Sequence, residues 1–171
     1  MFRIFFLATC LAVASASLAD PSPFGLELGK TTVSEAQAQY EMTASGINKY
    51  SGGPMFDVPT NQIEFDGLLG LTVIFDANDR LVGVLATLPK GRFRSLHQTL
   101  SGKYRLISET IPFVGDSTAK YIDGETEIML DAPHLSFELT MNYIRKELAE
   151  SFAEQSSAEA QEKRRAEDSQ L

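Results

Sequence analysis

The sequence predicts an α+β fold, an antiparallel sheet with helices packed on one face. Residues 71–88 read as a hairpin, because two apolar, β-branched-rich runs flank a turn-forming Asp-Ala-Asn-Asp. Over 135–143 apolar and polar residues alternate, which predicts a strand with one solvated face. Residues 33–42 and 93–100 repeat apolar residues at helical spacing.

The two expected helices carry terminal signals. Thr32 and Glu35 have the spacing of a capping box, in which each side chain bonds the other's backbone N–H. The second helix follows Pro89 and Gly91, and Gly102 occupies the place of a C-terminal capping glycine. We expect both helices to pack on one face of the sheet.

The remaining elements suggest a tandem arrangement of two α-β-β-β units, 25–88 and 89–143, within one domain over 20–145. Ala36 and Tyr40 of the first helix align with Leu96 and Leu100 of the second. A chance alignment of two helix-hairpin segments is the alternative. A glycine-rich loop is expected near 46–54, and strands are expected at 63–65, 71–75, 81–88, 118–123, 126–131 and 134–143.

Residues 1–19 have the pattern of a signal peptide. Arg3 precedes a short apolar run, and small residues at Ser17 and Ala19 mark a cleavage site before Asp20. The pattern resembles bacterial signal peptides, so we expect a periplasmic protein, with secretion as the alternative. A lipoprotein site at Cys10 is disfavoured because the apolar run before it is too short.

Cleavage after Ala19 changes the composition. The chain has 15 Lys+Arg, 23 Asp+Glu and one Cys. Without Arg3 the net charge is 14 − 23 = −9, and without Cys10 no cysteine remains. So acidic a protein is a poor nucleic-acid binder, whereas its charge favours a basic protein partner. No segment has the length of a transmembrane helix, and the oligomeric state is left open.

Residues 146–171 are expected to form a solvated tail, helical or disordered. Leu148 and Phe152 can dock the start of a helix on the domain. Beyond Gln155 the chain is Ala, Glu, Gln, Ser, Lys and Arg without an apolar stripe.

Catalytic and metal sites are not expected, and no cofactor is implied. The two histidines, His97 and His134, read as helix-edge and turn residues, and no G-x-S-x-G motif accompanies them. Asp76, Asn78 and Asp79 read as a hairpin turn, because a calcium loop needs further ligands that the next positions lack. The chain is therefore expected not to be an enzyme.

Two loops are the candidate binding residues. The first carries Met55, Phe56 and Asp57, and the second carries Phe113 and Asp116. Aromatic residues on loops held by a rigid scaffold are typical interface anchors. The alternative is that these aromatics fold back onto the core, and it is favoured for Phe113.

The segments 24–32 (Phe-Gly-Leu-Glu-Leu-Gly-Lys-Thr-Thr) and 75–81 resemble small bacterial envelope modules. The chain is similar in pattern to the outer-membrane assembly lipoproteins of the SmpA/OmlA type and to tandem-repeat β-lactamase inhibitor proteins. The resemblance implies helices against an antiparallel sheet and a role in binding other proteins. This chain departs from the first group in lacking a plausible lipid-anchored cysteine, and from the second in lacking cysteines after cleavage.

These observations together predict an exported protein-binding module, either an inhibitor or immunity protein for an envelope-acting enzyme or an accessory envelope factor. The alternative is a small-ligand or lipid carrier with a pocket between sheet and helices. It rests on residues 81–88, which are apolar at nearly every position.

Overall fold

The computed structural model describes residues 20–168. The expected signal peptide, 1–19, lies outside the described residues. Within them, no helix is long and apolar enough to cross a membrane.

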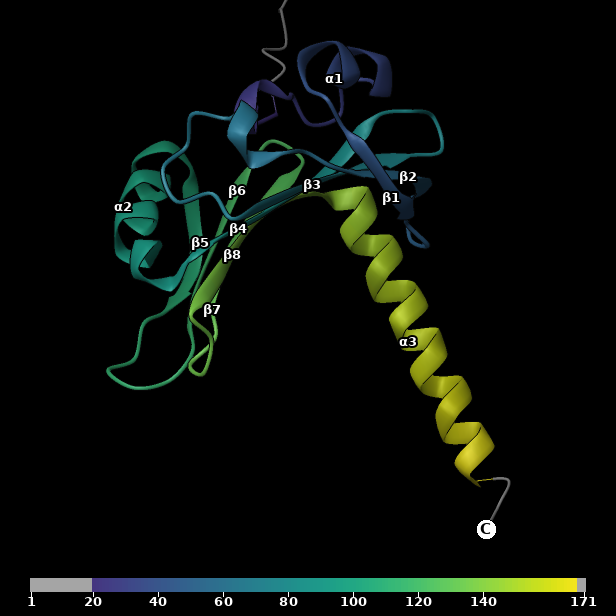
Figure 1. The fold of residues 1–171 in the computed structure, drawn as a ribbon. Helices are drawn as coiled ribbons and strands as arrows, with labels where there is room; N and C mark the ends of the chain where they lie inside the picture. The colour runs from purple at the N-terminus through teal and green to yellow at the C-terminus, as the bar shows by residue number, and fades with distance from the viewer. Residues whose placement is uncertain (1–19, 169–171) are drawn as a thin grey trace, which may run out of the picture.

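The described chain forms one eight-stranded antiparallel sheet with three α-helices (Figure 1). In space the strands follow the order β1-β2-β3-β4-β8-β7-β6-β5. Their bounds are β1 Thr43–Ile47, β2 Gly52–Asp57, β3 Gly70–Asp76, β4 Leu81–Pro89, β5 Arg105–Thr110, β6 Ser117–Asp123, β7 Thr126–Ala132 and β8 Glu138–Arg145. The helices are α1 Val33–Gln39, α2 Phe93–Lys103 and α3 Lys146–Asp168.

The predicted fold class is confirmed, but each unit has four strands rather than three. The order is symmetric about the β4–β8 pair, with α1 and β1–β4 on one side and α2 and β5–β8 on the other. The two expected helices are present, and the expected 71–88 hairpin is the β3–β4 pair. The extra strands, β1 and β5, are the two edges of the sheet.

The expected glycine-rich loop is wrong, because residues 43–57 form the β1–β2 hairpin. Gly46 lies at a β-bulge, where the register shifts after Ala44. A Cβ on Gly53 would lie 2.2 Å from the carbonyl oxygen of Asp76, so this glycine permits close approach of β2 to the end of β3. Gly46 and Gly53 therefore lie within strands and do not indicate a loop.

The strand expected at 63–65 is also wrong. Residues Thr60–Gln62 form a 3₁₀ turn, and the N–H of Ile63 donates to the carbonyl of Thr60. Ile63 and Phe65 pack on the core while Glu64 is exposed, so the apolar alternation is genuine. It belongs to a loop because no neighbouring strand pairs with the segment.

The capping box at the start of α1 is present, with Thr32 accepting from the N–H of Glu35 and the Glu35 carboxylate accepting from that of Thr32. The helix ends at Gln39 rather than residue 42, because Tyr40 is extended. The Tyr40 hydroxyl donates to the carbonyl of Phe24 and ties this end to the N-terminal segment. In α2, Gly102 lies in the last helical turn, not beyond it.

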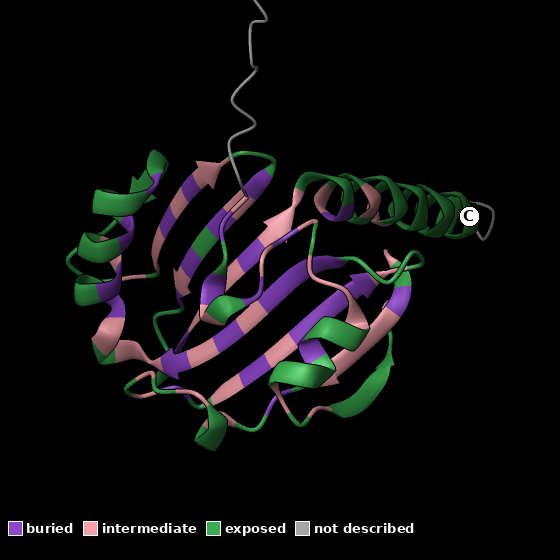
Figure 2. Ribbon diagram, turned by 90° about the horizontal axis from the view of Figure 1, so that it is seen from above, coloured by how far each residue is buried: buried purple, intermediate pink, exposed green. Residues whose placement is uncertain are grey.

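The main core lies between one face of the sheet and a layer made of the N-terminal segment, α1, α2 and the 58–69 loop. Alternate residues along the central strands are buried on this face (Figure 2). Phe93, Leu96 and Leu100 of α2 are buried against it, as predicted from their spacing. Among residues 20–168, the opposite face of the sheet has no comparable layer.

The expected C-terminal helix is present and continuous from Lys146 to Asp168. Its first turns dock Leu148 against Ile74 and Val82 on the face opposite the main core. A Cβ on Gly83 would lie 3.3 Å from a methyl group of Leu148, so this glycine makes room for the contact. Farther along, Lys49 and Glu159 form an ion pair of 2.9 Å, and α3 projects from the sheet (Figure 1).

The packing of Leu148 that holds the start of α3 against the sheet gives a stability prediction. We expect Leu148→Ala to lower the free energy of unfolding by about 2–3 kcal/mol, because it empties a buried site in a small cluster. Urea unfolding followed by far-UV circular dichroism measures the change. The matched control is Leu135→Ala at an exposed position, for which we expect less than about 0.5 kcal/mol. Equal effects of the two substitutions would contradict this account of how α3 is held.

Candidate functional site

The first group of predicted binding residues lies on strand β2, where neighbouring side chains point to opposite faces. The Phe56 ring packs edge-to-face on Phe75 of the core, 5.9 Å between centroids. Met55 packs with the small cluster around Leu148 on the other face. The structure therefore does not bring these residues together as a loop surface, and for Phe56 the packing alternative holds.

The second group lies in the loop between β5 and β6, where the structure departs from the favoured expectation. Phe113 is fully exposed, at 104%, so it does not fold back onto the core. The Asp116 carboxylate accepts a hydrogen bond of 2.6 Å from the N–H of His134. Asp116 thus links this loop to the neighbouring β7–β8 turn.

That neighbouring turn contributes residues that the sequence did not reveal. Leu135 and Phe137 are 92% and 94% exposed, because β8 begins at Glu138 and not at residue 134. Pro133, which cannot donate a ladder hydrogen bond, is the signal that places them in a turn. Together the two loops form a surface that we name the tip: Ile111, Phe113, Val114, Leu135 and Phe137.

The β7–β8 side of the tip is held by hydrogen bonds to Lys90. Its ammonium group donates to the carbonyl oxygens of Pro133 and His134, and its backbone N–H donates to the carbonyl of Phe137. The N–H of Ser136 also closes the turn by donating to Pro133. The loop is therefore fixed in position while its apolar side chains point to solvent.

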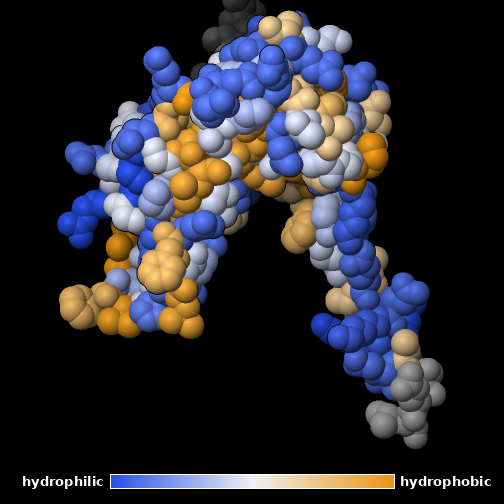
Figure 3. Space-filling model, in the orientation of Figure 1, coloured by the Kyte–Doolittle hydropathy of each residue, from blue (hydrophilic) through white to orange (hydrophobic). Residues whose placement is uncertain are grey.

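A second apolar surface lies on the face of the sheet opposite the main core. It is a groove of about 500 Å³ between the strands and the first turns of α3. In Figure 3 the molecule is hollowed below the sheet, with hydrophobic side chains along the hollow. We name it the concave groove and define it by Tyr50, Ile74, Leu85, Met129, Ile144, Leu148 and Phe152.

A third candidate is a cleft of about 420 Å³ on the main-core side, between α2, the N-terminal segment and the 58–69 loop. Its lining is rich in aromatic side chains: Phe24, Tyr40, Phe65, Tyr104 and Tyr143. The Phe24 backbone is in the left-handed region, with φ of 54°, which is uncommon for a bulky residue. This conformation places its ring edge-to-face with Phe65, 5.4 Å between centroids.

The cleft floor contains a buried polar group. Burial, followed by the neighbouring Tyr104, raises the pKa of the Tyr143 hydroxyl, which is therefore protonated at neutral pH. Thr99 and Lys103 of α2 lie at the rim. The cleft thus offers an apolar, aromatic interior with a few polar groups, the usual character of a small-molecule site.

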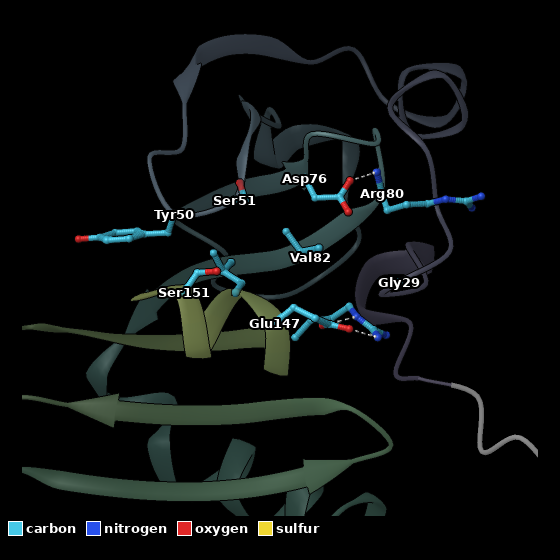
Figure 4. Close-up of a pocket in the computed structure, with 10 residues that line it drawn as sticks. Gly29, Tyr50, Ser51, Asp76, Arg80, Val82, Glu147 and Ser151 are labelled. Atoms are coloured by element: carbon cyan, nitrogen blue, oxygen red, sulfur yellow. Dashed lines mark hydrogen bonds and ion pairs between the residues drawn. The ribbon is translucent and has the colours of Figure 1, made fainter. Parts of the chain in front are cut away.

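A smaller polar cavity of about 240 Å³ lies where α3 leaves the sheet (Figure 4). Arg145 makes two hydrogen bonds to Glu147, of 2.9 and 3.0 Å, and an ion pair with Asp20. The Asp76 carboxylate accepts the backbone N–H groups of Asn78 and Arg80. These charged groups are engaged within the protein, so the cavity is a structural junction.

Asp76 and its neighbours therefore act as the predicted hairpin turn. Among the described residues, no cluster of three or more His, Cys, Asp or Glu side chains has the geometry to hold a metal ion.

His97 has more partners than its helix-edge position suggests. Its Nδ1 lies 2.5 Å from the Tyr121 hydroxyl, and its Nε2 lies 3.1 Å from the Glu109 carboxylate. Tyr121 is completely buried, so the hydroxyl is not presented to a substrate. The arrangement joins α2 to β5 and β6 and is a structural link.

No family model, curated protein or solved structure matches the chain. The resemblance to SmpA/OmlA-type lipoproteins and β-lactamase inhibitor proteins therefore stays a prediction.

The Arg145 junction gives a pH prediction. Hydrogen bonds from Arg145 lower the pKa of Glu147 below its ordinary value, despite partial burial of the carboxylate. A carboxylate with a lowered pKa stabilises the fold above its unfolded-state pKa, and the contribution is lost as pH falls through the folded-state value. We expect Glu147→Gln to be less stable than wild type at pH 7, by under about 1 kcal/mol because Glu147 is largely exposed.

The difference should shrink as the pH falls through the folded-state pKa of Glu147, and it should vanish once the carboxyl group is protonated in both states. Urea unfolding over a series of pH values from 7 downward measures it. The matched control is Glu150→Gln on the same helix, whose distance to Lys146 is 3.9 Å. A Glu147→Gln difference that persists unchanged at low pH would contradict the assignment.

Proposed function

We propose that the chain is an exported, non-enzymatic module that binds a basic protein partner through the tip. The observation that carries the proposal is the exposure of large apolar side chains, including Phe113, Leu135 and Phe137, on two adjacent loops. Exposed apolar patches of this kind mark interaction sites in proteins. Protruding aromatic rings are the usual anchors of protein interfaces.

The tip is also organised in advance of binding. Asp116 and Lys90 hold the two loops by hydrogen bonds, so little conformational entropy is lost when a partner orders the surface. In this proposal Asp116 is a positioning residue for the β7–β8 turn. Phe113 and Phe137 are the side chains that contact the partner.

Charge favours a basic partner. Residues 20–168 carry 14 Lys+Arg and 23 Asp+Glu, a net charge of −9. Such a field raises the rate of association with a cationic protein and makes it sensitive to salt. An envelope-acting enzyme with a basic surface, such as a muramidase, fits this requirement, and the chain would then act as its inhibitor or immunity protein.

Binding to purified cationic muramidases, measured by titration calorimetry, tests the proposal. We expect the double variant Phe113→Ala with Phe137→Ala to bind at least about 30-fold more weakly than wild type. The matched control is Ile47→Ala, which removes an exposed apolar side chain from the β1 edge, outside the tip. Added salt should weaken binding. Failure of every tested muramidase to bind at low salt, or equal affinities for wild type and the double variant, would overturn the proposal.

The aromatic cleft favours a second candidate, a carrier of a small apolar molecule. Its volume of about 420 Å³ lies within the range of small-molecule sites, about 300–1,000 Å³. The strained Phe24 backbone supports this candidate, because such strain concentrates at functional sites. The ligand would lie between sheet and helices, against the faces of Phe65 and Tyr104.

Fluorescence of N-phenyl-1-naphthylamine, a neutral aromatic probe, tests the carrier. We expect its emission to rise on binding and Thr99→Trp, at the cleft rim, to weaken the affinity at least about tenfold by filling the space. The control is Gln98→Trp, an exposed neighbour on α2 that does not line the cleft. A probe that does not bind, or that binds both variants equally, would remove this candidate.

A further inference from the structure

The aromatic cleft contains two pairs of rings that differ in polarity. Phe24 and Phe65 form a purely apolar pair, with their rings edge-to-face. Tyr104 and Tyr143 form the second pair, also edge-to-face, with 6.2 Å between centroids. These two tyrosines are only 7% and 5% exposed. The cleft is therefore apolar at one pair of rings and carries buried hydroxyl groups at the other.

The tyrosine pair provides a hydrogen-bond donor to the cleft. The hydroxyl groups of Tyr104 and Tyr143 interact with each other, and burial raises the pKa of Tyr143, so that its hydroxyl keeps its proton. Two hydroxyl groups hold two hydrogens, and a bond between them uses one. Among residues 20–168, neither hydroxyl donates to a backbone carbonyl or to another side chain. One O–H group is thus available to an acceptor bound in the cleft.

Lys103 adds a positive charge beside this pair. Its ammonium nitrogen lies 5.2 Å from the centroid of the Tyr104 ring, at the rim of the cleft. Within the described part of the chain it forms no ion pair with a carboxylate. Arg92 differs, because it lies over the Phe65 ring but is paired with Asp66 at 2.9 Å. The charge of Lys103 is therefore available to a ligand.

Other polar groups of the lining are already engaged. The hydroxyl groups of Tyr40 and Thr99 each donate to a backbone carbonyl, and the Gln62 amide bonds the backbone of Glu41 in both directions. The lining also includes one carboxylate, Glu64, which is exposed. The available hydrogen-bond donors within the cleft are therefore concentrated at the tyrosine pair and its neighbouring lysine.

We propose that the cleft binds an apolar monocarboxylic acid, with its carboxylate at Lys103 and the tyrosine pair and its apolar body against Phe24 and Phe65. The proposal rests on the carrier candidate above and adds the charge of the ligand. A carboxylate accepts hydrogen bonds and donates none, so it matches a cluster of donors. Burial of a charge is costly unless the charge is paired and hydrogen-bonded, and this end of the cleft supplies both kinds of partner.

The negative charge of the whole protein does not decide which ligand binds. At about 0.15 M salt the Debye length is about 8 Å, so exposed carboxylates farther away are largely screened. Glu64 is the carboxylate within the lining, and it opposes an anionic ligand. Selectivity then depends on the groups of the cleft itself, each of which can be changed separately.

Titration calorimetry of the purified chain at about 0.15 M salt tests the proposal. The ligands are decanoate, 1-decanol and decyltrimethylammonium, which share one alkyl chain and differ in charge, each used below its micelle concentration. We expect decanoate to bind at least about tenfold more tightly than 1-decanol, because a hydrogen bond to a charged group is stronger than one between neutral groups. The cationic ligand should bind most weakly.

Two variants remove the groups that hold the carboxylate. Tyr143→Phe keeps the ring and should weaken decanoate binding at least about tenfold. Lys103→Gln, at an exposed position, should weaken it about two- to fivefold and leave 1-decanol unchanged. Glu64→Gln should strengthen decanoate binding. The matched controls are Tyr50→Phe and Arg94→Gln, which lie outside the cleft. Circular dichroism verifies that each variant is folded.

Equal affinities for decanoate and 1-decanol overturn the proposal. A preference for decanoate that persists unchanged in both Tyr143→Phe and Lys103→Gln also overturns it, because the carboxylate is then held elsewhere. In either case N-phenyl-1-naphthylamine still binds and the carrier candidate stands. If neither this probe nor any of the three ligands binds, the carrier candidate fails together with the proposal. Muramidase binding through the tip is independent of all these outcomes.

Discussion

The structure depends on one constraint: the sheet has two faces, and the described part of the chain provides a full covering layer for one of them. The N-terminal segment, α1, α2 and the 58–69 loop bury the apolar side chains of the main-core face. Of the residues that the structure describes, the first turns of α3 pack on the opposite face, at Leu148. Apolar area removed from water stabilises the fold in proportion to its extent, so this covering layer holds the domain together. The remaining face is available for interaction.

The Arg145 junction decides how much of that second face is open. Arg145 ends β8 and pairs with Asp20 from the start of the described chain and Glu147 from α3. These pairs, with the seat of Leu148, direct α3 away from the sheet. The helix therefore forms one wall of the concave groove, and no described helix covers the part of the face around Thr87 and Thr140, which pair across β4 and β8. A helix lying flat on the sheet would have closed this surface.

The fold class was predictable because strand β8 and helix α2 each bury one side and therefore carry apolar periodicity. Strand β4 was recognisable as a continuous apolar run instead, since residues 81–84 are all buried. The edge strands could not be predicted in this way. Every residue of β1 and β5 is exposed, so neither has an apolar face to reveal a period of two. Residues 63–65 are the opposite case. Their apolar and polar side chains alternate because Ile63 and Phe65 pack on the core, yet the segment is a loop, because a strand is defined by its hydrogen-bond partners and not by periodicity.

The candidate sites show the same limit. Phe56 and Phe113 look alike in sequence, as aromatic residues near glycine and proline, yet one packs on the core and the other is fully exposed. The difference arises from pairing: β2 has neighbours on both sides, whereas the loop after β5 extends past the sheet. The sequence identified Phe113 and Asp116 but not Leu135 and Phe137. Their proximity depends on the β7–β8 turn lying beside a loop about twenty residues earlier.

The symmetric strand order also has a consequence for folding kinetics. Every strand pair except β4–β8 joins neighbours in the sequence, so each four-strand unit can form by local hairpins with low contact order. The β4–β8 pair is the one long-range step within the sheet, and it closes a loop of about 50 residues. Until that step occurs, both strands present unpaired edges, which are templates for pairing with another chain. Exchange of a whole four-strand unit between nascent copies would therefore occur at this seam.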